Sequence, residues 1–475
     1  MSNSRTKSPL DRFLNLFTGV EAGEGITSVL LTVNIFLIMT SYYIMKPVRE
    51  ALIIGGAGAV MKSYASTGQV ILLMIAVPIY ARIASRFPRR QLINYVTLFF
   101  VICIALFYGL ALLNVPLGVI FFLWIGIFNL MITAQFWAFA NDLYTPEEGK
   151  RLFVIVAFGA SSGAVLGGII TRILIEPLGP YQLLLVAGTI LFISLILTNY
   201  VDIRERTRLS LRSKEKSKQA EEPIPKGSAF KLLFQTKYLL LIAFLTFFLN
   251  WVNTNGEFIL GLNVQHAAEK KVEELKLQNQ NESKNINLDQ ATNIENMNTV
   301  YDEEYYQEYK ETFVGKFYAD FYTYVNIAGL LLQLFIVSRI LKYLGIRIGL
   351  LILPFIALGG YFIIAFYPIL SFIRMSKIAE NSTDYSLQNT VRHALFLPTT
   401  REQKYKAKQA IDTIFWRAGD VLSTALVAVG TTWLAFQTKQ FALVNLGLVC
   451  VWLILAVFIG RENKRLVGEY SGNNK

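Results

Sequence analysis

The feature of this sequence that most constrains its fold is a series of apolar runs, each about 20 residues long, that recur along the whole chain. A helix of that length crosses the hydrocarbon core of a bilayer, whereas a soluble protein interrupts such runs with polar faces. The composition agrees, because 54% of the residues are hydrophobic and only 16% are charged. Soluble domains carry about 25% charged residues. An all-α, polytopic membrane protein is therefore expected.

Hydropathy divides the chain into twelve predicted spanning helices. They cover residues 26–54, 64–83, 91–113, 116–142, 151–175, 180–202, 231–260, 316–341, 347–367, 369–397, 409–434 and 438–460. The helix at 369–397 is the least regular, since charged residues interrupt its apolar run. Gly159, Gly163 and Gly167 recur at every fourth position and predict a smooth face for close contact with a neighbouring helix.

Positive charge is distributed unevenly over the predicted loops. Lys and Arg follow the even-numbered helices, as in 86–90, 204–218 and 461–465, whereas the loops after odd-numbered helices are almost free of them. Cytoplasmic loops collect Lys and Arg, so both termini are expected in the cytoplasm. The formal net charge of +12 then follows from topology, and nucleic-acid binding is not expected.

Two polar stretches interrupt the helices. Residues 203–230 are expected to form a basic cytoplasmic linker. Residues from about 261 to 313 are rich in Asn, Gln, Glu and Lys, and are predicted to form a partly helical or disordered extracytoplasmic insertion. The expected organisation is an N-terminal six-helix bundle over 1–202, the linker, and a C-terminal six-helix bundle over 231–475 that carries the insertion.

The two halves also resemble each other in sequence. The basic segment Arg82–Arg90 is echoed by Arg339–Arg347, and Thr145–Glu148 is echoed by Thr400–Gln403 at nearly the same interval. Parallel six-helix repeats are typical of the major facilitator architecture, in which the substrate site lies between the halves near the bilayer midplane.

Charged residues inside spanning helices are costly, at about 2.5–3.5 kcal/mol each on insertion scales, and mark functional sites. The helix at 26–54 ends in Lys46, Arg49 and Glu50, and the spacing puts Lys46 on one face with each of the others. Such a cluster suits a phosphate or a carboxylate. Alternatively, Lys46 snorkels to the outer interface.

Two further helices end in polar groups. Asn141 and Asp142 close the helix at 116–142 and are candidate substrate contacts; alternatively, Asp142 caps the next turn or pairs with a cation across the bundle. Asn253 and Glu257, also candidate substrate contacts, lie in a helix end that three asparagines and Gly256 weaken. Broken helices at membrane depth line cavities, and Glu257 is a candidate for proton coupling or for pairing with a cation.

The helices at 369–397 and 409–434 hold the densest set of charges. It comprises Lys377, Glu380, Asp384, Arg392, Asp412, Arg417 and Asp420. Arg392 and Arg417 are predicted anion contacts, because guanidinium groups match phosphate bidentately. The spacing of Arg417 and Asp420 predicts an intrahelical ion pair. We assign Glu50, Asp412 and Asp420 to coupling or gating.

The sequence contains no phosphate-binding loop of the Gly-x-x-x-x-Gly-Lys-Ser/Thr type. Any transport is therefore expected to be secondary, by exchange or by ion coupling. No set of nucleophile, base and metal ligands converges, and His266 and His393 are too few for a metal cluster. We expect no enzymatic activity, no cofactor and no metal.

Several motifs together resemble the bacterial and plastid ATP/ADP translocase family. They are Tyr42–Leu52, Phe136–Asp142, Gly149–Phe153, Phe317–Phe321 and Arg401–Asp412 with Arg417. The match extends over nearly all of the chain except the termini and the insertion. The resemblance implies a facilitator-like fold in a bacterial inner membrane, nucleotide exchange, phosphate contact by Lys46 and a role of Glu257 in transport.

One position departs from the family pattern. Nucleotide exchangers of this family tend to carry a Gly-Lys pair just after the arginine that Arg417 matches, whereas this chain has Gly419-Asp420. A carboxylate there would repel a phosphate tail. The expected function is nucleotide exchange of the ATP/ADP type by a monomer, through alternating access. Proton-coupled transport of another small anionic solute and a non-transporting, partner-binding membrane protein are the alternatives.

Overall fold

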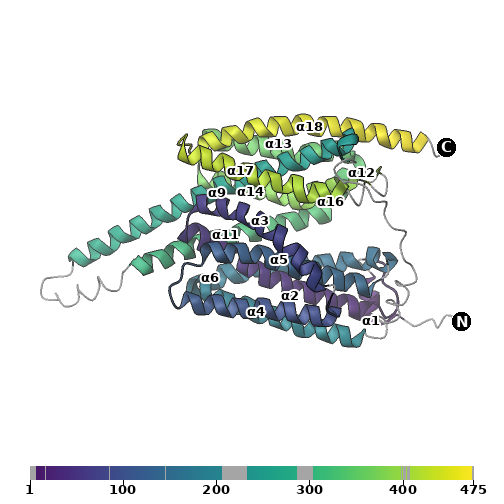
Figure 1. Cartoon of the computed structure of the whole chain (residues 1–475), viewed down its shortest axis with the longest axis horizontal. Coiled ribbons are helices and arrows are strands. Elements are labelled where there is room, and N and C mark those ends of the chain that lie inside the picture. Colours follow the sequence, from purple (N-terminus) through teal and green to yellow (C-terminus); the bar gives the residue numbers. More distant parts are fainter. Residues whose placement is uncertain are drawn as a thin grey trace. The chain divides into compact units, whose positions relative to one another are not determined.

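The computed structural model describes residues 7–472 except 16–17, 85, 145, 206–232, 286–302, 397, 400–402 and 404–406 (Figure 1). Most of the expected linker at 203–230 and the middle of the expected insertion therefore lie outside the described residues. Throughout the described ranges the regular structure is helical, without β-strands. The prediction of an all-α fold is confirmed.

The first half of the chain forms long helices joined by short turns. They are α1 (Pro9–Leu14), α2 (Gly25–Glu50), the π-helical turn η1 (Ala51–Gly55), α3 (Ala59–Ala84), α4 (Arg89–Ala111), α5 (Gly118–Leu143) and α6 (Pro146–Arg204). Helix α6 contains two predicted spans, which meet at Gly179. The φ of +77° at this residue breaks the helix, and glycine adopts that conformation without steric cost.

The second half contains more interrupted helices. They are α9 (Lys237–Asn285), α11 (Glu303–Leu332), η3 (Gln333–Val337), α12 (Ser338–Tyr343), α13 (Gly345–Phe366), α14 (Leu370–Thr383), η4 (Asp384–Gln388), α15 (Asn389–Ala394), α16 (Lys408–Ala410), η6 (Ile411–Phe415), α17 (Trp416–Thr432) and α18 (Thr438–Gly472). Each of the twelve predicted spans thus corresponds to one helix, to part of one, or to helices joined by a π-helical turn.

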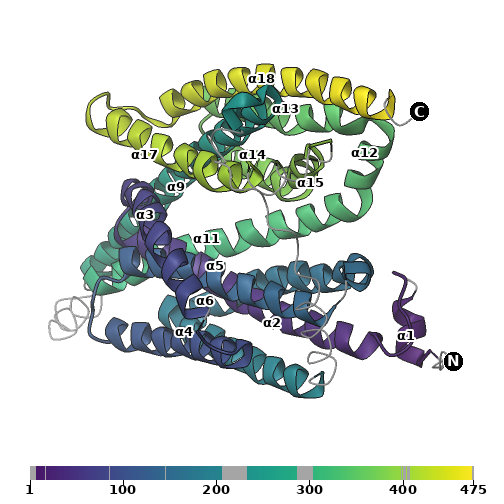
Figure 2. The same ribbon diagram turned by 45° about the vertical axis from the view of Figure 1, so that its right-hand side comes forward.

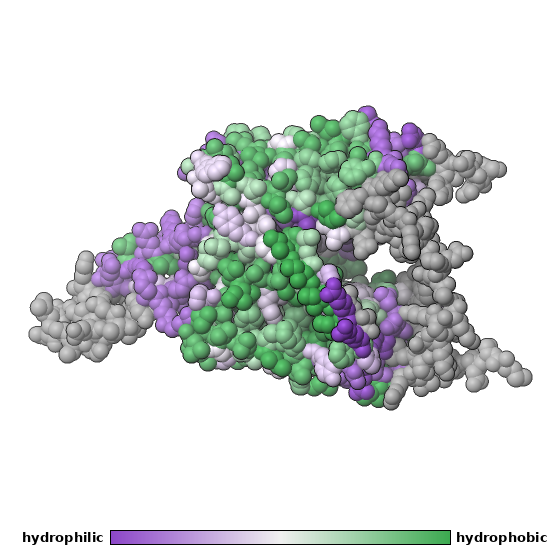
Figure 3. Space-filling model, in the orientation of Figure 1, coloured by the Kyte–Doolittle hydropathy of each residue, from purple (hydrophilic) through white to green (hydrophobic). Residues whose placement is uncertain are grey.

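Membrane-spanning character follows from length and composition. Within the described ranges, nine helices are long and apolar enough to cross a bilayer. Large hydrophobic side chains remain exposed on them, including Met74, Ile102, Ile173 and Phe355, and hydrophobic residues cover most of the helical surface in Figure 3. The polar end of α9 forms a separate hydrophilic region in the same view. This is the surface of a multi-pass membrane protein.

The chain divides into two compact units. Unit 1 comprises Met1–Gly56, Ile71–Glu222 and Tyr301–Thr323, and unit 2 comprises Ala57–Val70, Pro223–Val300 and Tyr324–Lys475. Helices α3 and α11 contribute one part to each unit. In unit 2, α13 and α9 both pack along α18, and α13 runs beside α18 in Figures 1 and 2.

In unit 1, α2 and α6 pack closely through the predicted glycine face. A Cβ atom on Gly159, Gly163 or Gly167 would lie 2.6, 2.3 and 2.6 Å, respectively, from the backbone oxygens of Thr32, Phe36 and Thr40. No larger residue fits without moving the helices apart. Close contact of this kind compensates for the weak hydrophobic driving force between helices in lipid.

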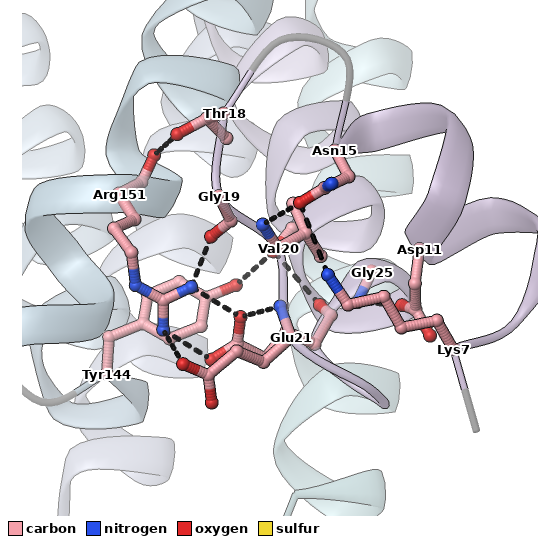
Figure 4. Close-up of polar contacts among 12 residues, drawn as sticks. Lys7, Asp11, Asn15, Thr18, Gly19, Val20, Glu21, Gly25, Tyr144 and Arg151 are labelled. Carbon is pink, nitrogen blue, oxygen red and sulfur yellow. Dashed lines mark hydrogen bonds and ion pairs between the residues drawn. The ribbon is translucent and has the colours of Figure 1, made fainter. Parts of the chain in front are cut away.

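The N-terminal segment from Ser8 to Glu24, which we term the N-terminal clasp, folds back on the start of α2 (Figure 4). Asp11 organises it, because its carboxylate accepts hydrogen bonds from the backbone N–H groups of Ser8, Gly23 and Gly25 at 2.9, 3.1 and 2.9 Å. Asp11 is almost fully buried. One carboxylate thereby satisfies donors on both sides of the turn.

Arg151, near the start of α6, fastens the clasp to the rest of unit 1. Its guanidinium donates to both carboxylate oxygens of Glu24, at 3.0 and 3.1 Å, and to the carbonyl of Gly19. The hydroxyl of Thr18 donates to the Arg151 carbonyl at 2.7 Å. The pairing of Arg151 with Glu24 joins the start of α2 to the start of α6.

Candidate functional site

Two buried charge clusters lie in the membrane-spanning helices, one in each unit. The unit 1 cluster consists of Lys46, Arg49 and Glu50 at the end of α2, with Tyr322 of α11. Lys46 is only 9% exposed. Its ammonium lies 3.9 Å from the ring centre of Tyr322 and 5.1 Å from that of Tyr43. Aromatic faces attract cations, so Lys46 is held in the bundle rather than extended along its surface.

The neighbouring charges of this cluster are paired. Arg49 forms an ion pair with the fully buried Glu50 and lies over the ring of Phe122, 4.8 Å from its centre. The hydroxyl of Tyr322 donates to the same Glu50 carboxylate at 3.2 Å. Two cations and one carboxylate thus meet at the end of α2, next to the π-helical turn η1. Such turns are frequent at functional sites.

The unit 2 cluster joins α9, α13 and α14 around Lys377. Lys377 contacts Glu380 at 3.0 Å, Asn253 Oδ1 at 2.9 Å and Glu257 at 3.7 Å. Asn381 donates to Glu257 at 2.9 Å, and Tyr361 donates to Glu380 at 3.0 Å. The structure therefore brings Asn253 and Glu257 together, and pairs Glu257 with a cation.

Asp420 of α17 is anchored in a neighbouring part of unit 2. Its carboxylate accepts from Asn250 at 2.8 Å, from Thr254 at 2.9 Å and from Arg417 at 3.2 Å. The predicted ion pair between Arg417 and Asp420 is confirmed. Asn250 and Thr254 belong to α9, one or two turns from Glu257, so Asp420 of α17 contacts α9 close to Glu257.

The remaining predicted residues lie elsewhere in their units. Arg392 lies over Trp416, with its guanidinium 4.7 Å from the ring centre, and Asp412 is exposed in η6. Asn141 is exposed, and Asp142 pairs with Arg89 at 2.9 Å.

Asp142 lies far from the unit 1 cluster. It is 20 residues along α5 from Phe122, which contacts Arg49, a separation of about 30 Å. Arg89 also pairs with Asp202 at 2.9 Å. Asp142 thus helps Arg89 to link α4, α5 and α6, and it does not belong to the Lys46 cluster.

Sequence reasoning did not assign Tyr322, Tyr361, Lys377 or Glu380 to the site. Lys377 and Glu380 could have been paired from their spacing of three within one helix. No sequence signal identified the tyrosines, because their roles depend on which helices meet. Metal-binding groups of three or more acidic, His or Cys side chains do not occur among the described residues.

Comparison with known proteins supports the fold. ADP,ATP carrier protein 1 of Chlamydia pneumoniae is 23% identical over 378 residues, which cover 70% of this chain and 64% of that protein. ADP,ATP carrier protein 1 of Chlamydia trachomatis is 21% identical over 371 residues, which cover 70% of this chain and 62% of that protein. This chain therefore spans less than two thirds of the length of these relatives.

Solved structures give the same architecture. The D-xylose-proton symporter matches with a TM-score of 0.58 and 12% identity, over 91% of this chain and 96% of that one. The nucleoside transporter NupG matches with a TM-score of 0.56 and 12% identity, over 91% and 98%. The family model of the Major Facilitator Superfamily matches residues 28–265, half of the chain. With twelve predicted spans recovered as helices, this chain belongs to the Major Facilitator Superfamily.

Proposed function

We propose that this protein is a secondary transporter that exchanges nucleotides, in ATP/ADP-type antiport, across a membrane by alternating access. Membership of the Major Facilitator Superfamily supports secondary transport. The similarity to proteins named ADP,ATP carriers supports a nucleotide as the solute. The transporter works without an enzymatic step, and the bilayer and the nucleotide are its partners.

The observation that carries this proposal is the position of Lys46. A lysine that is 9% exposed in a spanning helix is costly unless its charge is used. The ring of Tyr322 lies against it, and the Arg49–Glu50 pair lies within one turn. A phosphate group can bind the ammonium, and a base can stack on an aromatic ring beside it. Lys46 and Arg49 therefore serve as the proposed phosphate contacts, with Arg392 and Arg417 as further cations.

A second candidate function is proton-coupled transport of another small anionic solute. It is favoured by Asp420, which occupies the position after Gly419 where nucleotide exchangers tend to carry lysine. Asn250, Thr254 and Arg417 all contact its carboxylate. Either Asp420 or Glu257 would then carry the proton.

The test is transport by purified protein in liposomes. Uptake of labelled ATP is measured with ADP, with an unrelated anion, or with buffer alone inside the vesicles. Exchange predicts uptake only against internal nucleotide and no effect of a protonophore. Uptake that a protonophore abolishes, and that internal nucleotide does not change, selects the second candidate. Absence of uptake for every nucleotide tested would discard the proposal.

We also propose that the chain lies as a monomer in a bacterial inner membrane, with both termini in the cytoplasm. The support is the cation content of the loops after the even-numbered spans. The polar continuation of α9 beyond the apolar part of the helix then belongs to the outer side.

A further inference from the structure

Lys377 is the most deeply buried lysine among the described residues, with 1% of its side chain exposed. A lysine ammonium has three N–H donors. Glu380 and Asn253 Oδ1 accept at 3.0 and 2.9 Å, and Glu257 lies at 3.7 Å. One cation is therefore placed between two carboxylates that come from different helices, α14 and α9.

The two carboxylates are held differently. The side chain of Glu380 is 6% exposed, and Lys377 and Tyr361 each donate to one of its oxygens, at 3.0 Å. The side chain of Glu257 is 22% exposed, and its contact with Lys377 is longer. Breaking a buried ion pair is strongly destabilising. Glu380 is thus the fixed counter-ion of Lys377, whereas Glu257 can change its contacts without leaving a buried charge alone.

Gly256 makes this arrangement possible. A Cβ atom there would lie 2.0 Å from the hydroxyl of Tyr361 and 2.9 Å from Nζ of Lys377. Gly256 leaves a space beside Glu257, and α14 places Lys377 in this space.

Each unit thus places a cation beside a carboxylate of one long helix, α2 or α9. In unit 1 the cation is the adjacent residue of the same helix, and in unit 2 it comes from α14.

We propose that Lys377 is a positioning residue for transport, which orients Glu257 to accept hydrogen bonds from the transported solute. This inference rests on the proposed function. A carboxylate repels phosphate, so the solute groups that it receives are donors, such as sugar hydroxyls or the amino group of a base. The phosphates bind the cations of the proposed site instead.

Other polar groups of unit 2 surround Glu257. Lys377, Glu380 and Asn381 face it from α14, and Tyr361 faces the same cluster from α13. Asp420 of α17 meets α9 one turn away through Thr254, and α18 contributes the uncharged Asn445, which contacts Asn255. Among these groups Lys377 is the cation nearest to Glu257, so its removal is expected to change the orientation of the Glu257 carboxylate.

The experiment compares neutralising variants in the nucleotide exchange assay, with folded protein measured by size-exclusion profile and thermal stability. Lys377→Met leaves the buried Glu380 carboxylate without its counter-ion and is expected to lose folded protein. Lys377→Met/Glu380→Gln removes both charges of the fixed pair and is expected to restore folding, because replacing both partners is nearly neutral. Exchange by this double variant at neutral pH is expected to stay about tenfold low.

The KM for the nucleotide separates positioning from a purely structural role. The double variant is expected to raise this KM about tenfold, because a misoriented Glu257 binds the donors of the solute less well, whereas a loss of folded protein would lower only the maximal rate. Glu257→Gln keeps the Lys377–Glu380 pair, and is expected to fold normally but to exchange poorly. Lys271→Gln/Glu274→Gln, at an exposed ion pair of 2.7 Å on the same α9 helix, is the matched control and is expected to leave rate and KM unchanged.

Wild-type exchange and an unchanged KM in the double variant would overturn the inference, since Lys377 would then only neutralise Glu380. Wild-type exchange by Glu257→Gln would overturn it as well, even if the double variant did not fold. Failure of the wild-type protein to exchange any nucleotide is a different result, because it rejects the proposed function itself.

Discussion

At the scale of single residues, the molecule keeps its charges inside the membrane by pairing them with specific neighbours. Lys46 is held by aromatic rings, Arg49 by Glu50, and Lys377 by Glu380. The burial that makes these charges costly also strengthens their interactions, because the local dielectric is low. Removal of one partner should therefore change function or folding much more than removal of an exposed charge does.

Lys46→Met tests the phosphate contact. The methionine side chain has a similar length, and its sulfur packs well on the rings of Tyr43 and Tyr322, so thermal stability is expected to change little. Nucleotide exchange is expected to fall at least about tenfold, because a charge-assisted contact is lost. Lys439→Met, at an exposed lysine that starts α18, is the control. Exchange at the wild-type rate by Lys46→Met would contradict the proposed role.

Gly256→Ala tests the space beside Lys377. The added methyl group would overlap with Tyr361, at 2.0 Å from its hydroxyl, so folded protein and exchange are both expected to drop sharply. Gly359→Ala in α13 is the matched control, because nothing lies within 4 Å of a Cβ atom there. Equal thermal stabilities of the two variants would show that the Tyr361 hydroxyl can move away without cost.

At the scale of elements, helices are fastened to one another at their ends and interrupted near their charges. The π-helical turn η1 begins directly after Glu50, and η4 begins at Asp384. The turn η6 ends two residues before Arg417. The N-terminal clasp and Arg151 tie the start of α2 to the start of α6. Movement within unit 1 is therefore expected to be small at this end, where the paired groups are least able to separate.

The pH dependence of the N-terminal clasp follows from Asp11. Burial alone would raise the pKa of this carboxyl, but hydrogen bonds from Ser8, Gly23 and Gly25 lower it below its usual value of 3.8. A lowered pKa stabilises the folded clasp at every pH above the unfolded value, and the contribution is lost as pH falls through the native pKa. The clasp is therefore expected to stay closed from neutral pH down to about pH 4. It is expected to open as the pH falls further, through the native pKa of Asp11.

A fluorescent dye at Phe13→Cys, where the side chain is 57% exposed, reports this opening by a fall in anisotropy. The native Cys103 and Cys450 are replaced by serine for the labelling. Asp11→Asn is expected to give low anisotropy at all pH values, since the neutral amide is a weaker acceptor for the three N–H groups. An unchanged signal in Asp11→Asn would show that other contacts close the clasp.

At the scale of the whole molecule, topology makes the sharpest prediction. With both termini in the cytoplasm, Lys271 on the polar part of α9 should face the outside, and Arg461 on α18 should face the cytoplasm. In the same cysteine-free background, Lys271→Cys is expected to react with an impermeant maleimide in intact cells. Arg461→Cys is expected to react only after permeabilisation. The opposite labelling pattern would reverse the proposed orientation.

The sequence by itself determined the features that depend only on the order of residues along a single helix. Each apolar run must be long enough to cross the bilayer, so hydropathy could predict the positions of the helices, including the two that meet at Gly179. Nine of the described helices are apolar enough to span the bilayer. The Arg417–Asp420 pair and the glycine face of α6 could be predicted because helix periodicity fixes which neighbours share a face.

Only the tertiary structure decided which charges meet across helices. Asp142 pairs with Arg89 instead of joining Lys46, and Glu257 lies beside Lys377, a residue more than one hundred positions away. Tyr322 belongs to the Lys46 cluster because this part of α11 packs in unit 1. These contacts depend on the rotation of each helix about its axis and on its neighbours, and the hydropathy of a single span contains no information on either.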